Sequence, residues 1–542
     1  MFSAPHFPCT PYGRDEASLP SFDLRTEPWI PARPSNGGAA VPVGLKDLFL
    51  NAHDLADVEL ALPPASAGLW RILALITARL TGLDTWTEFS DWAQARAAEL
   101  EEGRFDPAEV RAYFDVRHPD RFDLYGDRPW LQDPRLHGAD AQCAKRSGIN
   151  KLCWGRPAGN TQVWLRHTHD LRPIPVPSAD AAHHLIATLY YGPSGRCTAR
   201  TAGQVSAGDT AAGPLRGALS FHPLGRTLYE SLLLNVPFVE EDEDGPAPWE
   251  RDGLPDPTLP PLATGLAGRL TGQFRHAVLL RPSADGALAV DATVTWGARI
   301  TPRLRETWSP PEDPYQIHGE RADGTVAPER ADARRAVWRD VSAILQDGQH
   351  RGRATRMPRL HRHLRHGLPA DVTHAMRARA YGFDQDGQTR DKQWFTATTP
   401  RVLRWLHESA DDDERAGRTR RAIREATEAA EDAGWRLERQ IVRAWKDSGL
   451  GGEVKRGDRS PWSQAAADHY WPRAEDLFWR LVLDEDPREP GNGFIHLAVD
   501  AYTATTDGYR HRPRVARAVA RHRGALFKNW NHGPAASGEG AA

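Results

Sequence analysis

The order of apolar and polar positions divides the chain into segments of different character. Apolar residues at three- and four-residue spacing predict helices in the first half of the chain. Ser66 and Ser178 stand at N-cap positions, and Gly192 follows the last apolar residue of one segment, as a helix end requires. The pattern predicts helices over residues 66–82, 84–102, 178–191 and 224–235.

Other segments have the turn residues and β-rich runs of hairpins. Residues 21–51 contain several prolines and the pair Asn36-Gly37, which predicts short extended segments joined by a tight turn. Residues 276–300 contain two β-rich runs on either side of Asp285-Gly286, which predicts a second hairpin.

Residues 381–394, YGFDQDGQTRDKQW, allow three interpretations: a calcium loop, an ordinary hairpin, or a fingertip that contacts another molecule. If Gly387 were the sixth residue of an EF-hand loop, Gly382 and Gln393 would occupy the first and twelfth positions, where carboxylates are required. The spacing therefore excludes a calcium loop and predicts a hairpin with Asp386-Gly387 at its tip.

Gln388 stands beside this tip. Its amide offers a donor and an acceptor, and a small protruding tip can wedge into a duplex and unstack a base step. The same pattern also fits a hairpin that is merely solvated, so the motif alone leaves both interpretations open.

Two long segments rich in Gly, Pro, Thr and Arg lie between the predicted helices, over residues 148–177 and 192–217. Irregular stretches of this length inside a compact protein are usually functional or disordered. We therefore expect them to be loops that carry binding residues.

Basic residues are concentrated in two stretches. Residues 351–379 hold eight arginines and one acid, and residues 510–528 hold seven Lys or Arg and no acid, although the net charge of the chain is only −3. Such stretches can neutralise DNA phosphates. Only 7 of the 69 basic residues are lysines, which is also what the codon bias of a high-GC genome produces, so a solvated basic face remains an alternative.

The last part of the chain is helical in pattern, and short connections between its helices favour a bundle. We expect helices near residues 399–414, 416–447, 462–484, 493–506 and 512–527. With 542 residues, two or three domains are expected. We predict an α+β protein with a flexible tail at 1–20, an α/β N-terminal domain at 21–395 and a C-terminal helical bundle at 396–542.

Several classes of protein lack support in the sequence. The four cysteines form no C-x-x-C pair, no signal peptide is recognisable, and arginines interrupt the most apolar run at 69–80, which together favour a cytoplasmic protein without a membrane span. No phosphate loop, nucleophile elbow or dinucleotide-binding motif occurs, and no cofactor is expected. Histidines cluster at 167–169, 183–184 and 361–366 without ligand spacing, so we expect surface or packing roles rather than a metal site.

Several segments, in one order, resemble the CasA family, the large subunits of type I-E Cascade CRISPR surveillance complexes. The segments are FDLRTEPWIPARPSNGG, YFDVRHPDRFDLYGDRPWLQD, INKLCW, LRGALSFHPLGRTLYESLLLNV and RARAYGFDQDGQTRDKQWF. The resemblance covers residues 21–542, although the helical end matches by pattern more than by motif.

The resemblance implies an α/β N-terminal domain with long loops and a C-terminal four-helix bundle. It implies a non-catalytic subunit that reads the protospacer-adjacent motif of double-stranded DNA through the minor groove, promotes R-loop formation and recruits the helicase-nuclease. The implied partners are the other Cascade subunits, the CRISPR guide RNA and the target DNA.

Family members read the motif with a glycine-rich loop, a basic finger and a glutamine wedge. Carried over to this sequence, the motif-reading residues are Gly192, Ser194, Gly195, Arg299, Gly387 and Gln388. Arg303 is a rival to Arg299, and the glycine contacts can also lie later, at Gly203, Gly208, Gly213 or Gly217. A loop that contacts guide RNA and a neighbouring subunit is expected within 150–170, with Lys151, Trp154 and Arg156 as its contacts.

A second function stays open. The histidine clusters, with acids brought close by folding, would suit a metal-dependent enzyme that processes nucleic acid.

Overall fold

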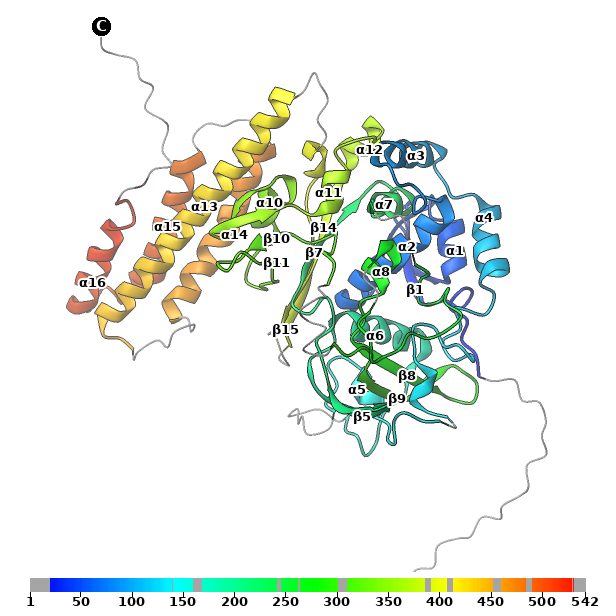
Figure 1. Ribbon diagram of the computed structural model, residues 1–542. Coiled ribbons are helices and arrows are strands. Elements are labelled where there is room, and N and C mark those ends of the chain that lie inside the picture. Colours follow the sequence, from blue (N-terminus) through cyan, green and yellow to red (C-terminus); the bar gives the residue numbers. More distant parts are fainter. Residues whose placement is uncertain are drawn as a thin grey trace, which may run out of the picture.

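The protein folds into an α+β body with a bundle of helices beside it (Figure 1). The computed structural model describes residues 20–138, 140–158, 168–240, 245–261, 264–300, 310–385, 391–406, 413–451, 460–483, 490–528 and 530.

Two buried helices form the centre of the body. Helix α2 (Pro63–Thr81) packs against α6 (Ser178–Tyr191). Both helices were predicted from the apolar spacing, but α2 begins at Pro63, so Ser66 lies inside the helix and not at its N-cap. The two helices approach closely because Gly68 has no side chain, and a Cβ there would lie 2.5 Å from Ile186 Cγ2 and from the Tyr190 ring. Shorter helices surround this pair: α1 (Leu45–Leu50), α3 (Phe89–Glu102), α4 (Pro107–Arg111), α5 (Ile149–Leu152), α7 (Leu228–Leu234) and α8 (Gly265–Thr271).

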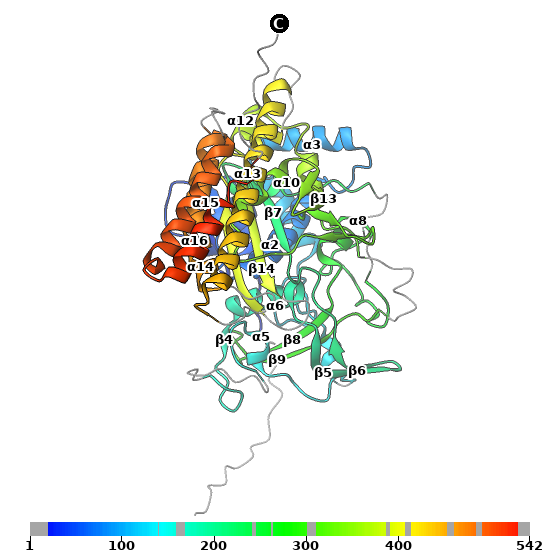
Figure 2. The ribbon, with the colours of Figure 1, turned by 90° about the vertical axis from the view of Figure 1, so that its left-hand side faces the viewer.

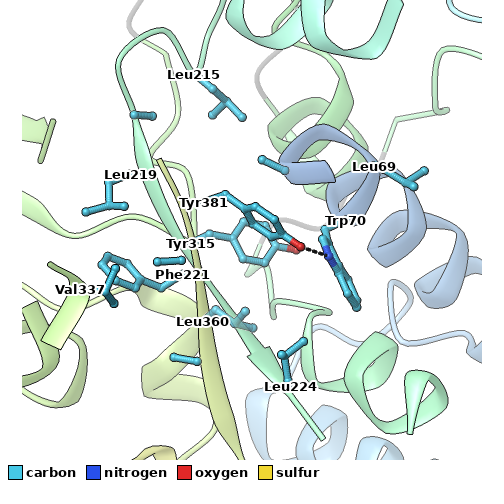
Figure 3. Close-up of a cluster of buried hydrophobic side chains, with 14 of the residues drawn as sticks. Leu69, Trp70, Leu215, Leu219, Phe221, Leu224, Tyr315, Val337, Leu360 and Tyr381 are labelled. Atoms are coloured by element: carbon cyan, nitrogen blue, oxygen red, sulfur yellow. Dashed lines mark hydrogen bonds between the residues drawn. The ribbon is translucent and has the colours of Figure 1, made fainter. Parts of the chain in front are cut away.

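A three-stranded antiparallel sheet lies against this helical core. Its strands, in the order β15-β14-β7, are β7 (Leu219–Leu224), β14 (Arg377–Gln385) and β15 (Asp391–Thr398). The indole N–H of Trp70 on α2 donates a hydrogen bond to the Tyr381 hydroxyl on β14 at 2.9 Å (Figure 3). The predicted hairpin at 381–394 is confirmed by the pairing of β14 with β15, and its tip lies outside the described residues.

The other sheets are small and antiparallel. In one, β8 (His276–Pro282) and β9 (Leu288–Trp296) form the predicted hairpin, with Gly286 at a φ of 72° in the turn, and β4 (Val176–Pro177) extends it. Two further sheets have the orders β2-β1-β3 and β11-β10-β13-β12. Their strands are β1 (Ile30–Pro34), β2 (Val41–Val43), β3 (Leu55–Val58), β10 (His318–Glu320), β11 (Val326–Pro328), β12 (Gly348–His350) and β13 (Arg353–Arg356).

The prediction of an irregular loop over residues 192–217 is wrong. Most of this segment is a hairpin of β5 (Gly195–Ala202) and β6 (Val205–Thr210), which turns at Gly203. The fully buried Arg200 anchors the hairpin to the rest of the body, since its guanidinium lies 2.6 Å from Asp133 Oδ2. The glycines and threonines gave no strand signal; the pairing of β5 with β6 is local, whereas the buried anchor depends on Asp133, which is distant in sequence.

Four helices form the bundle, and α13 contacts the other three. They are α13 (Asp413–Ser448), α14 (Pro461–Leu483), α15 (Pro490–Thr506) and α16 (Pro513–Gly524). The helix expected near 399–414 is present in the described residues only as a 3₁₀ turn at Leu403–Leu406, because Thr399 still bonds to the backbone of Ala378 on β14.

A short segment of the body, from η3 (Val337–Asp340) to α10 (Val341–Leu345), docks on the bundle. Trp338 packs against Phe478 of α14, with ring centroids 4.8 Å apart, and Arg339 binds Glu431 of α13. Figure 1 shows β7 and β14 between the bundle and the helical body. The body's last two helices are α11 (Arg359–His363) and α12 (Ala370–Ala375).

Within the described ranges, no helix is both long and apolar enough to span a membrane.

Candidate functional site

The loop end of hairpin β14–β15, where Gln385 pairs with Asp391, is held by a network of hydrogen bonds. Gln388 and Gly387 lie outside the described residues, but the strand ends that carry them are described. Gln385 is 3% exposed; its side-chain Oε1 accepts from the N–H of Gly217 at 3.0 Å, and its Nε2 donates to Asp391 Oδ1 at 2.7 Å. One side chain therefore joins both strands of the hairpin to the segment before β7.

Two arginines reinforce this junction. Arg216 lies 2.8 Å from Asp391 Oδ1 and also donates to the carbonyl of Tyr191 at the end of α6. Arg330 donates to the backbone carbonyl of Gln385 at 2.6 Å. The two strand ends are thus held from two separate segments, residues 216–217 and Arg330.

Two glycines of the 192–217 segment are required at this junction. Gly217 has a φ of 72°, and a Cβ there would lie 2.7 Å from the Arg330 guanidinium. At Gly213, a Cβ would lie 2.5 Å from the carbonyl oxygen of Tyr190. Of the later glycines considered in the sequence, Gly217 therefore packs at the loop end of the hairpin and Gly213 packs against the end of α6. Gly203 and Gly208 have no close contact among the described residues.

Gly192 is buried and packs inside the protein. A Cβ at this position would lie 2.5 Å from the Thr188 oxygen and 2.6 Å from the His276 ring, so glycine allows the close contact. The next carbonyl, of Pro193, accepts from His276 Nε2 at 3.0 Å, and burial lowers the pKa of His276 to about 4. Neutral His276 thus holds the start of the segment against β8.

Ser194 and Gly195, the other two positions expected in the glycine loop, are half-buried. Gly195 has a φ of 120° and begins β5, so the chain turns there into the β5–β6 hairpin. This hairpin lies at the lower end of the molecule in Figures 1 and 2.

Arg299 follows β9 and is tied to the β5–β6 hairpin. Its guanidinium lies 3.3 Å from Asp209 Oδ2 on β6 and 5.5 Å from the centroid of the Trp296 ring. The Arg299 side chain keeps 31% of its surface exposed, and that of Asp209 keeps 64%. The rival Arg303 lies outside the described residues.

Of the expected RNA-contact residues, Trp154 lies against β14. Trp154 packs against Phe383 of β14 with ring centroids 5.3 Å apart. Arg156 donates to the Ile174 carbonyl at 2.6 Å, and Lys151 is exposed on α5. The hairpin and this segment therefore share a packing contact, although residues 159–167 lie outside the described part of the chain.

The two basic stretches differ in structure. In residues 351–379 most arginines pair with acids from distant segments, for example Arg353 with Glu329 at 2.7 Å and Arg362 with Asp347 at 2.8 Å. In α16, Arg514 and Arg517 bond only to backbone carbonyls among the described residues. Folding therefore neutralises much of the first stretch and leaves the second positively charged.

The histidines of two clusters have packing roles. His183 lies 2.8 Å from the carbonyl of Trp29, His361 Nδ1 lies 2.9 Å from the Ile344 oxygen, and His363 accepts from the Phe238 N–H. Burial lowers the pKa of His361 to about 4 and that of His363 to about 3. In the part of the chain that the structure describes, no group of three His, Cys, Asp or Glu side chains is arranged to hold a metal ion.

Sequence reasoning missed the residues that position the hairpin. Gln385 and Asp391 lie within the quoted hairpin motif, but nothing in its spacing links them to Arg216 or Arg330. Gly217 and Gln385 are 168 positions apart, and their contact depends on the pairing of β14 with β7.

Comparisons with known proteins agree on one family. The sequence model described as CRISPR-associated protein Cse1 matches residues 23–505. A "CRISPR-associated protein CasA/Cse1" from Thermus thermophilus is 31% identical over 342 residues, which cover 60% of this chain and 61% of the relative. The match thus spans about three fifths of the length of this curated relative.

Solved structures match over nearly the whole chain. A chain of a "CRISPR RNA-guided surveillance complex" is 46% identical, with a TM-score of 0.83, and the match covers 94% of this chain and 100% of that one. The crystal structure of Thermus thermophilus CasA is 21% identical, with a TM-score of 0.69 and coverage of 93% and 99%, which shows a shared fold.

Proposed function

Because the chain belongs to the CRISPR-associated Cse1 family, we propose that it is the large subunit of a type I-E Cascade surveillance complex. In this role it reads the protospacer-adjacent motif of foreign double-stranded DNA through the minor groove. It then promotes duplex opening, so that the guide RNA can pair with the target strand.

The observation that carries this proposal is the set of contacts at the loop end of hairpin β14–β15. Gln385 binds Gly217 and Asp391 and so fixes the strand ends on either side of Gln388. A wedge must be held rigidly, because unstacking a base step costs a few kcal/mol and a loose side chain would be pushed aside.

The rest of the recognition surface follows from the same proposal. Gly192, Ser194 and Gly195 open the segment that approaches the DNA, Arg299 is the basic finger, and Gly387 and Gln388 form the wedge. The minor groove offers a degenerate donor and acceptor pattern, so tolerance of several related motifs is expected.

The proposed partners follow from the family. Lys151, Trp154 and Arg156 contact the guide RNA or a neighbouring Cascade subunit, and the chain recruits the helicase-nuclease after the R-loop forms. The subunit is cytoplasmic and has no catalytic activity of its own. The proposed domains are the N-terminal one at 21–395, after the tail at 1–20, and the bundle at 396–542.

The test uses the reconstituted ribonucleoprotein with Gln388→Ala and, as a matched control, Gln349→Ala, since Gln349 is an exposed glutamine on the hairpin β12–β13. A gel shift compares DNA carrying the correct motif with DNA carrying a scrambled one, and permanganate footprinting follows strand opening. Gln388→Ala should slow opening of correct-motif DNA, whereas Gln349→Ala should not. Equal R-loop formation by both variants and the wild type would refute the wedge. DNA cleavage by the purified chain with divalent metal and no partner would favour the enzyme instead.

A further inference from the structure

A cavity of about 580 Å³ lies between three segments of the body. They are residues 128–135, the proline-rich residues 254–261, and the chain at the paired ends of β8 and β9. Phe274 is a half-buried lining residue, while Trp130 and Trp249 lie beneath the surface, at 1% and 3% exposed. A volume of this size with an apolar lining and an aromatic ring is typical of sites for small planar ligands.

The cavity shares its wall with the elements proposed to read DNA. Gly297 and Ala298 line it, and Arg299 follows directly, with its N–H bonded to the carbonyl of Pro257 at 3.0 Å. His276 also lines the cavity while it holds Pro193 at the start of the glycine segment. A ligand in the cavity therefore lies next to the proposed motif-reading surface.

The rim offers positive charge. Arg251 bonds to the Pro246 carbonyl at 3.1 Å and has no carboxylate within 4.0 Å among the described residues. Burial lowers its pKa, so an anion beside it would be favourable. Arg128 is 55% exposed, and its nearest acid is Asp252, at 3.8 Å and 95% exposed. An anionic group can thus bind at the rim while an aromatic group fills the interior.

We propose that this cavity binds an unpaired nucleotide, with its base against the Phe274 ring and its phosphate at Arg251 and Arg128. The occupant is a nucleotide of the DNA strand that is displaced beside the motif. This assignment rests on the proposed function, because strand opening next to Arg299 is what supplies an unpaired base there. Base–aromatic stacking tolerates any base, so the cavity holds the strand open without reading its sequence.

The experiment uses the assembled complex and target DNA with 2-aminopurine at successive positions of the displaced strand. Stacking quenches the fluorescence of 2-aminopurine. After strand opening, fluorescence should therefore stay low at one position next to the motif and rise at the neighbouring positions. Leu259→Asp, at a cavity residue that is 55% exposed, and Arg251→Gln should each restore brightness at that position and weaken R-loop binding roughly tenfold, the scale of one stacking contact.

Matched controls lie on the β8–β9 hairpin and do not line the cavity. Leu288→Asp replaces a leucine that is 37% exposed, and Arg281→Gln replaces an exposed arginine. With both control variants, the fluorescence at the quenched position should stay as low as in the wild type.

Motif discrimination on unlabelled duplexes is measured in parallel. If the wild-type complex does not discriminate, the proposed function fails. If it discriminates but no position is quenched, or Leu259→Asp leaves the quenching unchanged, the cavity proposal alone is wrong. Cavity-dependent quenching of a label in the guide RNA, or of free 2-aminopurine deoxyribonucleotide, would identify a different nucleotide as the occupant and refute the displaced strand.

Discussion

The backbone N–H of Gly217 donates to the side-chain Oε1 of Gln385 at 3.0 Å, across 168 positions of sequence. The same amide of Gln385 donates to Asp391 on the returning strand. One buried side chain thereby holds both ends of the loop that contains Gln388.

Gln385→Leu should loosen this hairpin. The change preserves most of the volume but leaves the Gly217 N–H without its acceptor, which costs about 1–3 kcal/mol for a buried group. We expect faster hydrogen exchange at Gly217 and in Asp391–Thr398, together with slower strand opening by the complex. Gln349→Leu, at an exposed site, is the control, and equal exchange in both variants would show that Gln385 does not hold the hairpin.

Asp209→Asn should strengthen DNA binding by removing the ion pair with Arg299, whose guanidinium keeps its hydrogen bond to the Asp209 backbone carbonyl at 3.0 Å. Both side chains are partly exposed, so the ion pair contributes at most about 1 kcal/mol and the gain in affinity should be no more than about fivefold. The double variant Asp209→Asn with Arg299→Gln should lose this gain. If Asp209→Asn gives the same gain when Arg299 is absent, the effect comes from the removed negative charge alone.

Substitutions in α16 should flatten the salt dependence of DNA binding. Among the described residues Arg514, Arg517 and Arg521 have no carboxylate within ion-pair distance, so they are free to meet phosphates. Replacing each by Gln should reduce the slope of log K against log [salt] by about 1 for each phosphate that the helix no longer neutralises. An unchanged slope would show that these arginines are only solvated.

The control for α16 is a set of arginines that are already paired: Arg353→Gln, Arg356→Gln and Arg362→Gln. These changes should leave the slope unchanged and lower the stability of the free chain instead. A slope change equal to that of the α16 set would contradict the assignment of the two basic stretches.

Glu431→Gln should weaken the attachment of the bundle. Glu431 binds Arg335 and Arg339, whose side chains are only 10% and 12% exposed, so its loss leaves two nearly buried cations without their shared partner. Because Glu431 itself is 34% exposed, we expect a loss of about 2 kcal/mol in the free energy of unfolding, below the range for fully buried pairs. Urea titration measures this free energy of unfolding, and Glu428→Gln, at an exposed position, is the control. Equal urea midpoints for Glu431→Gln and Glu428→Gln would contradict the prediction.

Mild acid should destabilise the protein through buried histidines. Burial lowers the pKa of His184, His276 and His361 to about 4, below the ordinary value of 6.5. The unfolded chain therefore binds more protons between pH 6.5 and 4. Each histidine contributes stability that is fully present above pH 6.5 and falls by up to about 3 kcal/mol as the pH drops toward 4.

Urea midpoints measured from pH 7 to pH 4.5 test this prediction, with His276→Gln as the diagnostic variant. Its amide can still donate to the Pro193 carbonyl but does not titrate, so the decline should be shallower than in the wild type. A parallel decline would show that His276 does not contribute to it.

The sequence by itself determined the local elements with strong periodicity and clear ends. Residues 178–191 form a helix because their apolar spacing and the following glycine are local signals, and the predicted range is the observed one. The hairpin around Asp285-Gly286 could also be predicted from the sequence, since the conformation of a tight turn depends mainly on the residues within it. The order of motifs was also sufficient to place the chain in its family.

The tertiary structure alone decided which residues support the candidate site. The ion pair of Arg200 with Asp133 anchors the β5–β6 hairpin, in a segment whose sequence looks irregular. The acids that neutralise residues 351–379 likewise come from distant segments. Gly217 meets Gln385 only after β14 has paired with β7. Such contacts bring together groups that are far apart in the chain, and no local pattern records them, because their free energy depends on burial that the whole fold creates.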